Sequence, residues 1–190
     1  MKKNENVLTR LVFGAVMAAM VYVVTLFRIP FLGSKIHFAN AVCLLCGIFL
    51  GPVNGGLAAG LGSALYDVTL GGYDFINALI TFVSKFAMAW VCGKIVGRPQ
   101  SKAAPVVRLI TGCVSGALTY VVLYMAKTFV YQKFVYGFPI DAVGLTMYSK
   151  LIPSLINALA SVIAAPIFYH AVRPALKGTG ILAKLKDTAE

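Results

Sequence analysis

A lysine lies near the middle of one of the most apolar stretches of this chain. Lys85 falls within residues 75–96, which are otherwise mostly apolar. A lysine at bilayer depth costs about 2.5–3.5 kcal/mol on insertion scales, so an ionisable group there predicts a functional site. Its ammonium group is suited to hold a carboxylate, a phosphate or a ring acceptor, and a low dielectric strengthens that attraction. The alternative, which the sequence leaves open, is a structural ion pair with Asp67.

Other polar and aromatic side chains are spaced to share helix faces. Asn77, Thr81 and Lys85 follow one another at intervals of four, so on a helix they line one wall. Tyr120 and Tyr124 are also four apart and predict an aromatic face that stacks on a flat ring. Lipid-facing tyrosines near the membrane interface are the open alternative.

Three more polar residues complete the predicted binding site. The amide of Asn157 both donates and accepts hydrogen bonds, which suits a heterocyclic ligand, although a hydrogen bond between helices explains it equally. Asn40, together with His37, is predicted to form part of the rim. Lys150, like Lys127, either reaches the ligand or extends to the lipid headgroups.

The composition identifies the class of protein. Of 190 residues, 59% are hydrophobic and 12% are charged, whereas an ordinary soluble domain carries about 25% charged residues. The chain therefore reads as a multi-pass, all-α protein of the cell membrane, with a single domain over residues 1–190. The net charge of +11 reflects orientation in the membrane rather than nucleic-acid binding, because the basic residues cluster at the ends of apolar segments.

Six membrane spans are expected in a compact bundle. They cover approximately residues 8–29, 36–50, 53–70, 75–96, 106–131 and 147–172. The second and third are short for a hydrocarbon core that requires about 20 residues, and the turn signal at Gly51-Pro52 joins them in a tight hairpin. The segments 28–35 and 134–146 contain proline and glycine and are expected to act as gating loops.

The distribution of lysine and arginine predicts that both termini are cytoplasmic. With that orientation, eleven basic residues lie inside: Lys2, Lys3, Arg10, Lys94, Arg98, Lys102, Arg108, Arg173, Lys177, Lys184 and Lys186. Five lie in the outer half: Arg28, Lys35, Lys127, Lys133 and Lys150. The outer half also holds Asp67, so a polar cluster there suits the capture of a solute from outside.

Pairs of small residues four apart recur along the chain and predict close packing of helices. Gly47/Gly51 and Gly93/Gly97 are examples. Ala15 and Ala19 differ, because they lie in the cytoplasmic half of the first span, among larger apolar residues. They form either another internal contact or a groove for a partner protein.

The sequence argues against an enzyme and against a metal or cofactor site. An H-E-x-x-H pattern does not occur, and Ser84 and Lys85 project about 100° apart on a helix, which is a poor nucleophile–base pair. Cys43-x-x-Cys46 has metal-ligand spacing but no second cysteine pair, so small packing residues are the better interpretation.

Residues 36–93 carry a series of motifs in a distinctive order. Leu50-Gly51-Pro52 is followed by Gly55-Gly56, Gly60, Gly62-Ser63-Ala64 and Asp67, then by Gly71-Gly72-Tyr73 and Ser84-Lys85. This order resembles the S components of energy-coupling-factor (ECF) vitamin transporters, in particular the riboflavin-like group. Ala15-x-x-x-Ala19 resembles the docking motif of that family.

The resemblance implies a function that composition does not show. It implies a high-affinity, substrate-binding subunit that captures a vitamin or related micronutrient in an outward-facing pocket. It also implies partners, namely a membrane-embedded T component and two cytoplasmic ATPases. Consistently, the chain has no G-x-x-x-x-G-K-[ST] motif for a nucleotide phosphate. A self-contained small secondary transporter or channel for a polar or anionic solute is the alternative.

Overall fold

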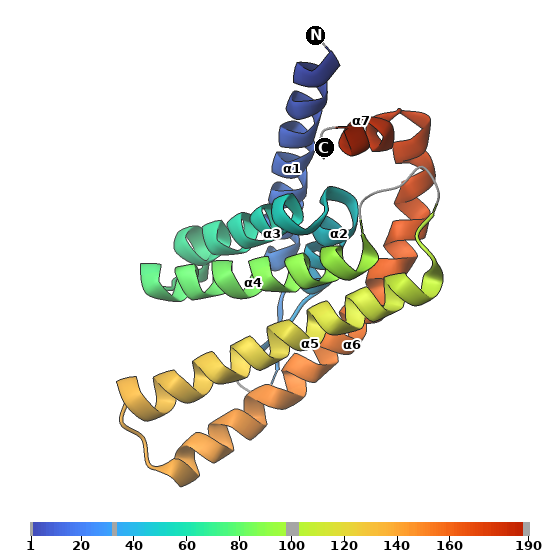
Figure 1. Cartoon of the computed structure of the whole chain (residues 1–190). Coiled ribbons are helices and arrows are strands. Elements are labelled where there is room, and N and C mark those ends of the chain that lie inside the picture. Colours follow the sequence, from blue (N-terminus) through green and yellow to red (C-terminus); the bar gives the residue numbers. More distant parts are fainter. Residues whose placement is uncertain (1, 32–33, 98–102, 188–190) are drawn as a thin grey trace.

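Figure 1 shows a computed structural model of the chain, which consists mainly of helices. The structure describes residues 2–31, 34–97 and 103–187. Arg98 and Lys102, which were counted for orientation, lie outside the described residues. Each of the six predicted spans corresponds to a helix: α1 (Lys2–Leu26), α2 (Ala39–Leu50), α3 (Pro52–Tyr66), α4 (Phe75–Val96), α5 (Val106–Val130) and α6 (Ile140–Gly178).

The segments between α1 and α2 and beyond α6 differ from the prediction. The expected first span reaches residue 29, but α1 ends at Leu26, consistent with Pro30 disfavouring a helical conformation at the preceding residue. The predicted loop 28–35 instead contains a two-stranded antiparallel hairpin, β1 (Ile29–Phe31) and β2 (Ser34–Ile36). A short helix, α7 (Ile181–Asp187), follows α6 and packs against α1.

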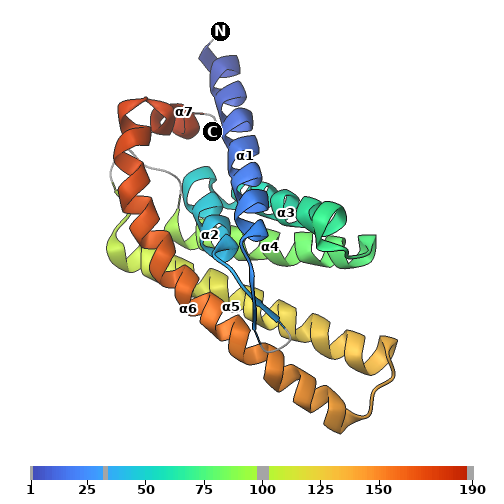
Figure 2. The same ribbon diagram turned by 180° about the vertical axis from the view of Figure 1, so that it is seen from behind.

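The predicted gating loop at residues 134–146 is wrong. α5 continues into a π-helical turn, η2 (Tyr131–Val135), and α6 begins at Ile140, directly after Pro139. A second π-helical turn, η1 (Asp67–Gly71), extends α3 in the same way. Only four residues, 136–139, therefore separate η2 from α6, and α5 and α6 run side by side in opposite directions (Figures 1 and 2).

Among the described residues, four helices are long and apolar enough to cross a membrane: α1, α4, α5 together with η2, and α6. By contrast, α2 has 12 residues and α3 has 15. Every residue of α2 is buried, and its neighbours are α1, α3, α4, α5 and α6. A helix that is apolar on all sides is expected inside a protein. Protein therefore surrounds α2 on all sides, which explains why it is shorter than a lipid-facing span.

Close contact between α2 and α4 depends on glycine. A methyl group on Gly93 would lie 2.7 Å from the backbone oxygen of Gly47 and 2.9 Å from the backbone nitrogen of Pro52. The turn between α2 and α3 uses Gly51 at a φ of 77°, a conformation that glycine adopts without strain. The small residues identified in the sequence thus bring α4 against the α2–α3 turn.

We predict that Gly93→Ala destabilises the protein. The added methyl group meets backbone atoms that cannot move aside, and such overpacking costs about 1–3 kcal/mol. The thermal midpoint of unfolding in detergent should therefore fall.

Gly144→Ala is the matched control. Gly144 lies in α6, and its added methyl group would meet nothing within 4 Å. Alanine there should leave the midpoint unchanged or raise it, because alanine is the better helix former. Equal midpoints for the two variants would contradict the role assigned to Gly93.

Candidate functional site

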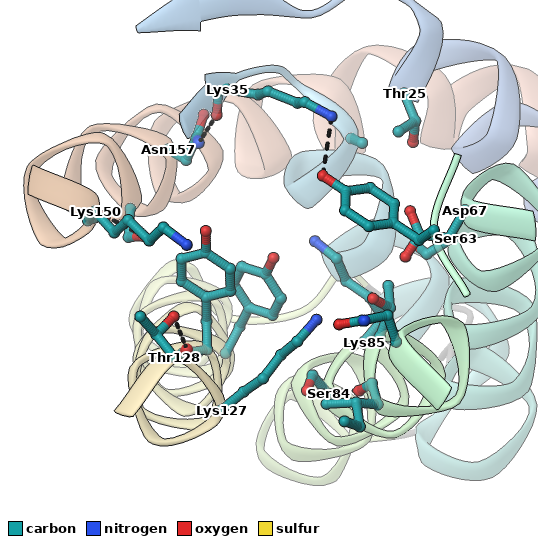
Figure 3. A pocket seen from close by; sticks show the side chains of 18 of the residues that line it. Thr25, Lys35, Ser63, Asp67, Ser84, Lys85, Lys127, Thr128, Lys150 and Asn157 are labelled. Atoms are coloured by element: carbon teal, nitrogen blue, oxygen red, sulfur yellow. Dashed lines mark hydrogen bonds between the residues drawn. The ribbon is translucent and has the colours of Figure 1, made fainter. Parts of the chain in front are cut away.

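A cavity of about 340 Å³ lies among the helices and the hairpin. Figure 3 shows side chains from several helices around it, among them Lys85 of α4, Lys127 of α5 and Lys150 of α6. Eight of the nine predicted binding residues line this cavity: Asp67, Asn77, Thr81, Lys85, Tyr120, Tyr124, Lys150 and Asn157. The ninth, Asn40, lies behind the wall and contacts Lys85.

Lys85 is the most deeply buried charge in the described part of the cavity wall. Its side chain is 4% exposed, and Nζ donates a hydrogen bond to Oδ1 of Asn40, which is 1% exposed. Nζ also lies 3.7 Å from the centre of the Tyr120 ring, in the geometry of a cation–π contact. Lys85 therefore joins α4 to α2 and α5 through two neutral partners.

The predicted alternative for Lys85, an ion pair with Asp67, does not form in the described part of the chain. Asp67 begins the turn η1 and faces the same cavity. Its carboxylate interacts with the side chain of Thr81. The two charges share the cavity without direct contact.

Tyr120 and Tyr124 form the aromatic wall that their spacing predicts. Their ring centres are 6.0 Å apart, and the ring planes differ by 18°. Both line the cavity, so the alternative of two lipid-facing tyrosines does not apply. Flat ligands stack on such surfaces.

Asn157 connects α6 to the hairpin. Its Nδ2 donates a hydrogen bond of 2.7 Å to the backbone oxygen of Lys35, and its Oδ1 accepts one of 3.0 Å from the backbone N–H of His37. Lys35 in turn donates to the hydroxyl of Tyr73 at 3.1 Å (Figure 3). Both ends of the Asn157 amide are thus used to position the hairpin at the cavity.

Asn77 bonds to the residue that caps the helix carrying Lys85, which is Asp74. The carboxylate of Asp74 accepts hydrogen bonds from the backbone N–H and from the side-chain amide of Asn77, at 2.8 and 2.6 Å. Asp74 is therefore the N-cap residue of α4. The same two hydrogen bonds lower the pKa of Asp74, so its carboxylate stays ionised at neutral pH. Asn77 therefore borders the cavity while its amide stabilises the start of α4.

The predicted set left out several cavity residues. Tyr66 and Tyr73 line the wall, as do Arg28 and Lys35 from the region of the hairpin. The charge distribution along the sequence was the available signal, because it placed Arg28, Lys35 and Lys127 on one side of the membrane. It did not show that these side chains converge on one cavity, since convergence depends on the hairpin.

We predict that Asn157→Ala loosens the hairpin. Losing both hydrogen bonds leaves a buried backbone donor without its partner, which costs about 1–3 kcal/mol. Amide hydrogen exchange of residues 34–38 should then accelerate by about tenfold, because 1.4 kcal/mol corresponds to a factor of ten.

Ser161→Ala is the matched control for this exchange measurement. Ser161 is buried on the same helix, and its hydroxyl bonds only to the backbone of α6, at Ala158. Exchange of the hairpin should be unchanged in that variant. Unchanged exchange in Asn157→Ala as well would show that the two hydrogen bonds do not hold the hairpin.

Comparison with known sequences gives two matches. A sequence model described as "ECF-type riboflavin transporter, S component" matches residues 5–174, which is most of the chain. An uncharacterised protein of Pyrococcus woesei is 35% identical over 107 residues, which cover 55% of this chain and 68% of that protein.

Comparison with solved structures gives the same fold. The S component of a bacterial ECF transporter superposes with a TM-score of 0.67, over 88% of this chain and 97% of that one. The two sequences are 18% identical, so this likeness concerns the fold alone.

Proposed function

The chain belongs to the ECF-type riboflavin transporter S component family, and from this premise we propose how it works in nutrient uptake. It is a multi-pass membrane protein and a substrate-binding subunit of a transport family, which is not a class of enzymes. In the proposed function it captures a vitamin or related small nutrient from outside the cell. It then delivers the nutrient by docking on a T component driven by two cytoplasmic ATPases.

The observation that carries this proposal is the cavity around Lys85. Its volume is about 340 Å³, and binding pockets for small molecules are typically about 300–1,000 Å³. Hydroxyl, amide and ammonium groups from α3, α4, α5 and α6 face into it. Such a mixture of aromatic wall and convergent polar groups suits a small polar nutrient that contains a ring.

The proposed orientation places the cavity on the outer side, with all six helices α1 to α6 crossing or entering the membrane. The start of α1 and the helix α7 lie at one end of the molecule (Figures 1 and 2). Thr25 and Arg28, at the opposite end of α1, line the cavity. If both termini are cytoplasmic, as the basic residues predict, the cavity is closer to the outer surface.

The proposed docking surface is the exposed face of α1. Ala15 and Ala19 are exposed there, next to the large apolar side chains of Leu11, Val16 and Met20. By contrast, the backbone of the neighbouring Ala18 packs against Gly62 of α3. The small-residue groove of α1 therefore points away from the bundle, where a helix of a T component can approach closely.

We predict that Lys85→Met abolishes or strongly weakens binding of the nutrient while the protein still folds. Methionine keeps the length of the side chain but removes the charge that faces the cavity. The small molecules that co-purify with the chain, identified by mass spectrometry, provide the ligand for a binding titration.

Lys94→Met is the matched control for this titration. Lys94 lies on the same helix but is exposed and far from the cavity wall, beside Trp90. The Lys94→Met variant should bind the ligand as tightly as the unaltered protein. Unchanged affinity in Lys85→Met would remove Lys85 from the binding site.

We predict that replacing Ala15 and Ala19 together by tryptophan spares binding but blocks uptake. Two indole groups fill the groove on α1, so a partner helix can no longer approach closely. Uptake is measured in cells that also produce the T component and the ATPases, and binding is measured on the purified variant.

Leu159→Trp is the control for this uptake measurement, since Leu159 is exposed on α6 rather than on α1. It should transport normally, and normal uptake by the double alanine variant would overturn the docking proposal. The unaltered chain alone in liposomes should move no solute. Transport without partners would favour a self-contained transporter.

A further inference from the structure

The charges that line the cavity are strongly unbalanced. Five basic side chains border it, from Arg28, Lys35, Lys85, Lys127 and Lys150. Asp67 is the single carboxylate among the described residues of the wall. The cavity therefore carries a marked surplus of positive charge.

The contacts of these basic groups do not offset that charge. Lys35 bonds to the hydroxyl of Tyr73, and Lys127 Nζ lies 5.7 Å from the centre of the Tyr131 ring. The guanidinium of Arg28 lies 5.4 Å from the centre of the Tyr66 ring. All of these partners are neutral. Among the described residues, Nη1 of Arg28 is buried with no hydrogen-bond partner at all.

Positive charges that converge in a partly enclosed cavity are unfavourable, because the charged groups lose hydration and repel one another. Neutral partners satisfy hydrogen bonds but leave this repulsion in place. A bound anion removes both penalties, because it pairs with ammonium groups that already converge. Lys127 and Lys150 extend from neighbouring helices toward the same space, with Lys85 on the facing wall (Figure 3).

The aromatic wall defines the other half of the ligand. Tyr120 and Tyr124 lie nearly parallel along α5, and Tyr120 also borders Lys85. A flat ring that stacks on this wall would hold its substituents within reach of Lys85 and Lys127. The cavity volume of about 340 Å³ is at the small end of the range for ligand pockets.

We propose that the cargo of this protein is an organic anion, namely a flat aromatic or heteroaromatic ring that carries a carboxylate or a phosphate ester. This assignment rests on the proposed function, because it names the substrate class of the same cavity. The ring stacks on Tyr124, beside the Tyr120 ring that Lys85 contacts. The anionic group binds among Lys85, Lys127 and Lys150.

Matched pairs of probes test the assignment on the full-length chain purified in detergent. Nicotinate and nicotinamide differ by a carboxylate, whereas riboflavin 5′-phosphate and riboflavin differ by a phosphate ester. In calorimetric titrations, the acid of at least one pair should bind about tenfold more tightly than its neutral counterpart, because hydrogen bonds to charged groups are the stronger ones. The pair that shows the preference identifies the carboxylate or the phosphate as the anionic group.

The variant Lys127→Gln separates a charge effect from a structural one. It should weaken binding of the acid about tenfold more than binding of its neutral counterpart, so that the ratio of the two affinities falls about tenfold. Lys133→Gln is the control: Lys133 lies in the turn η2 and is absent from the cavity wall, so the ratio should not change. A general loss of structure in Lys127→Gln would instead weaken both members of a pair.

The outcomes distinguish this inference from the function on which it rests. If the neutral member of each pair binds as tightly as the acid or more tightly, the proposed anionic cargo is wrong. The proposed role as a substrate-binding subunit is then retained. If no probe binds but a neutral compound co-purifies, the anionic cargo is likewise wrong and the role as a binding subunit is retained. If no probe binds and no small molecule co-purifies, both the anionic class and the proposed function are wrong.

Discussion

The burial of Lys85 is the constraint on which the rest of the structure depends. An ammonium group removed from water needs compensating contacts, and the protein provides an amide oxygen from Asn40 and the ring face of Tyr120. These partners come from two other helices, so α2, α4 and α5 must meet at one point.

The small residues in the helices allow this meeting point to form. The backbones of α2 and α4 touch where Gly47 faces Gly93, and α5 approaches α4 where a methyl group on Gly116 would lie 2.7 Å from the backbone oxygen of Met88. Such contacts bring Asn40 and Tyr120 within reach of a lysine side chain that is itself only four bonds long beyond Cβ. The glycines therefore allow the site to form, although none of them is among the described residues of the cavity wall.

The sequence predicted the helices and eight of the cavity-lining residues because both follow from local patterns. Apolar stretches of about 20 residues specify helices, and intervals of four placed Asn77, Thr81 and Lys85 on one face. The hairpin could not be predicted, because its two three-residue strands carry no alternating pattern and Asn157 holds it from more than 100 residues away. The prediction also made the loop before α6 too long. Proline and glycine near residues 137–139 suggested a loop over residues 134–146, whereas α6 begins at Ile140.

Buried asparagine and buried lysine differ in how much they reveal about function. A buried amide needs hydrogen-bond partners, and the backbone of the protein can supply them, as it does for Asn157. The same side chain therefore fits a ligand contact and an internal tether equally well, and only the fold decides between them. For a buried cation, neutral amide and tyrosine partners lower the cost of burial but leave its net charge in place. Among the described residues, the cavity wall holds five basic groups and one carboxylate, so its charge is strongly unbalanced. Lysines in apolar segments are for this reason the more informative signal in a sequence of this kind.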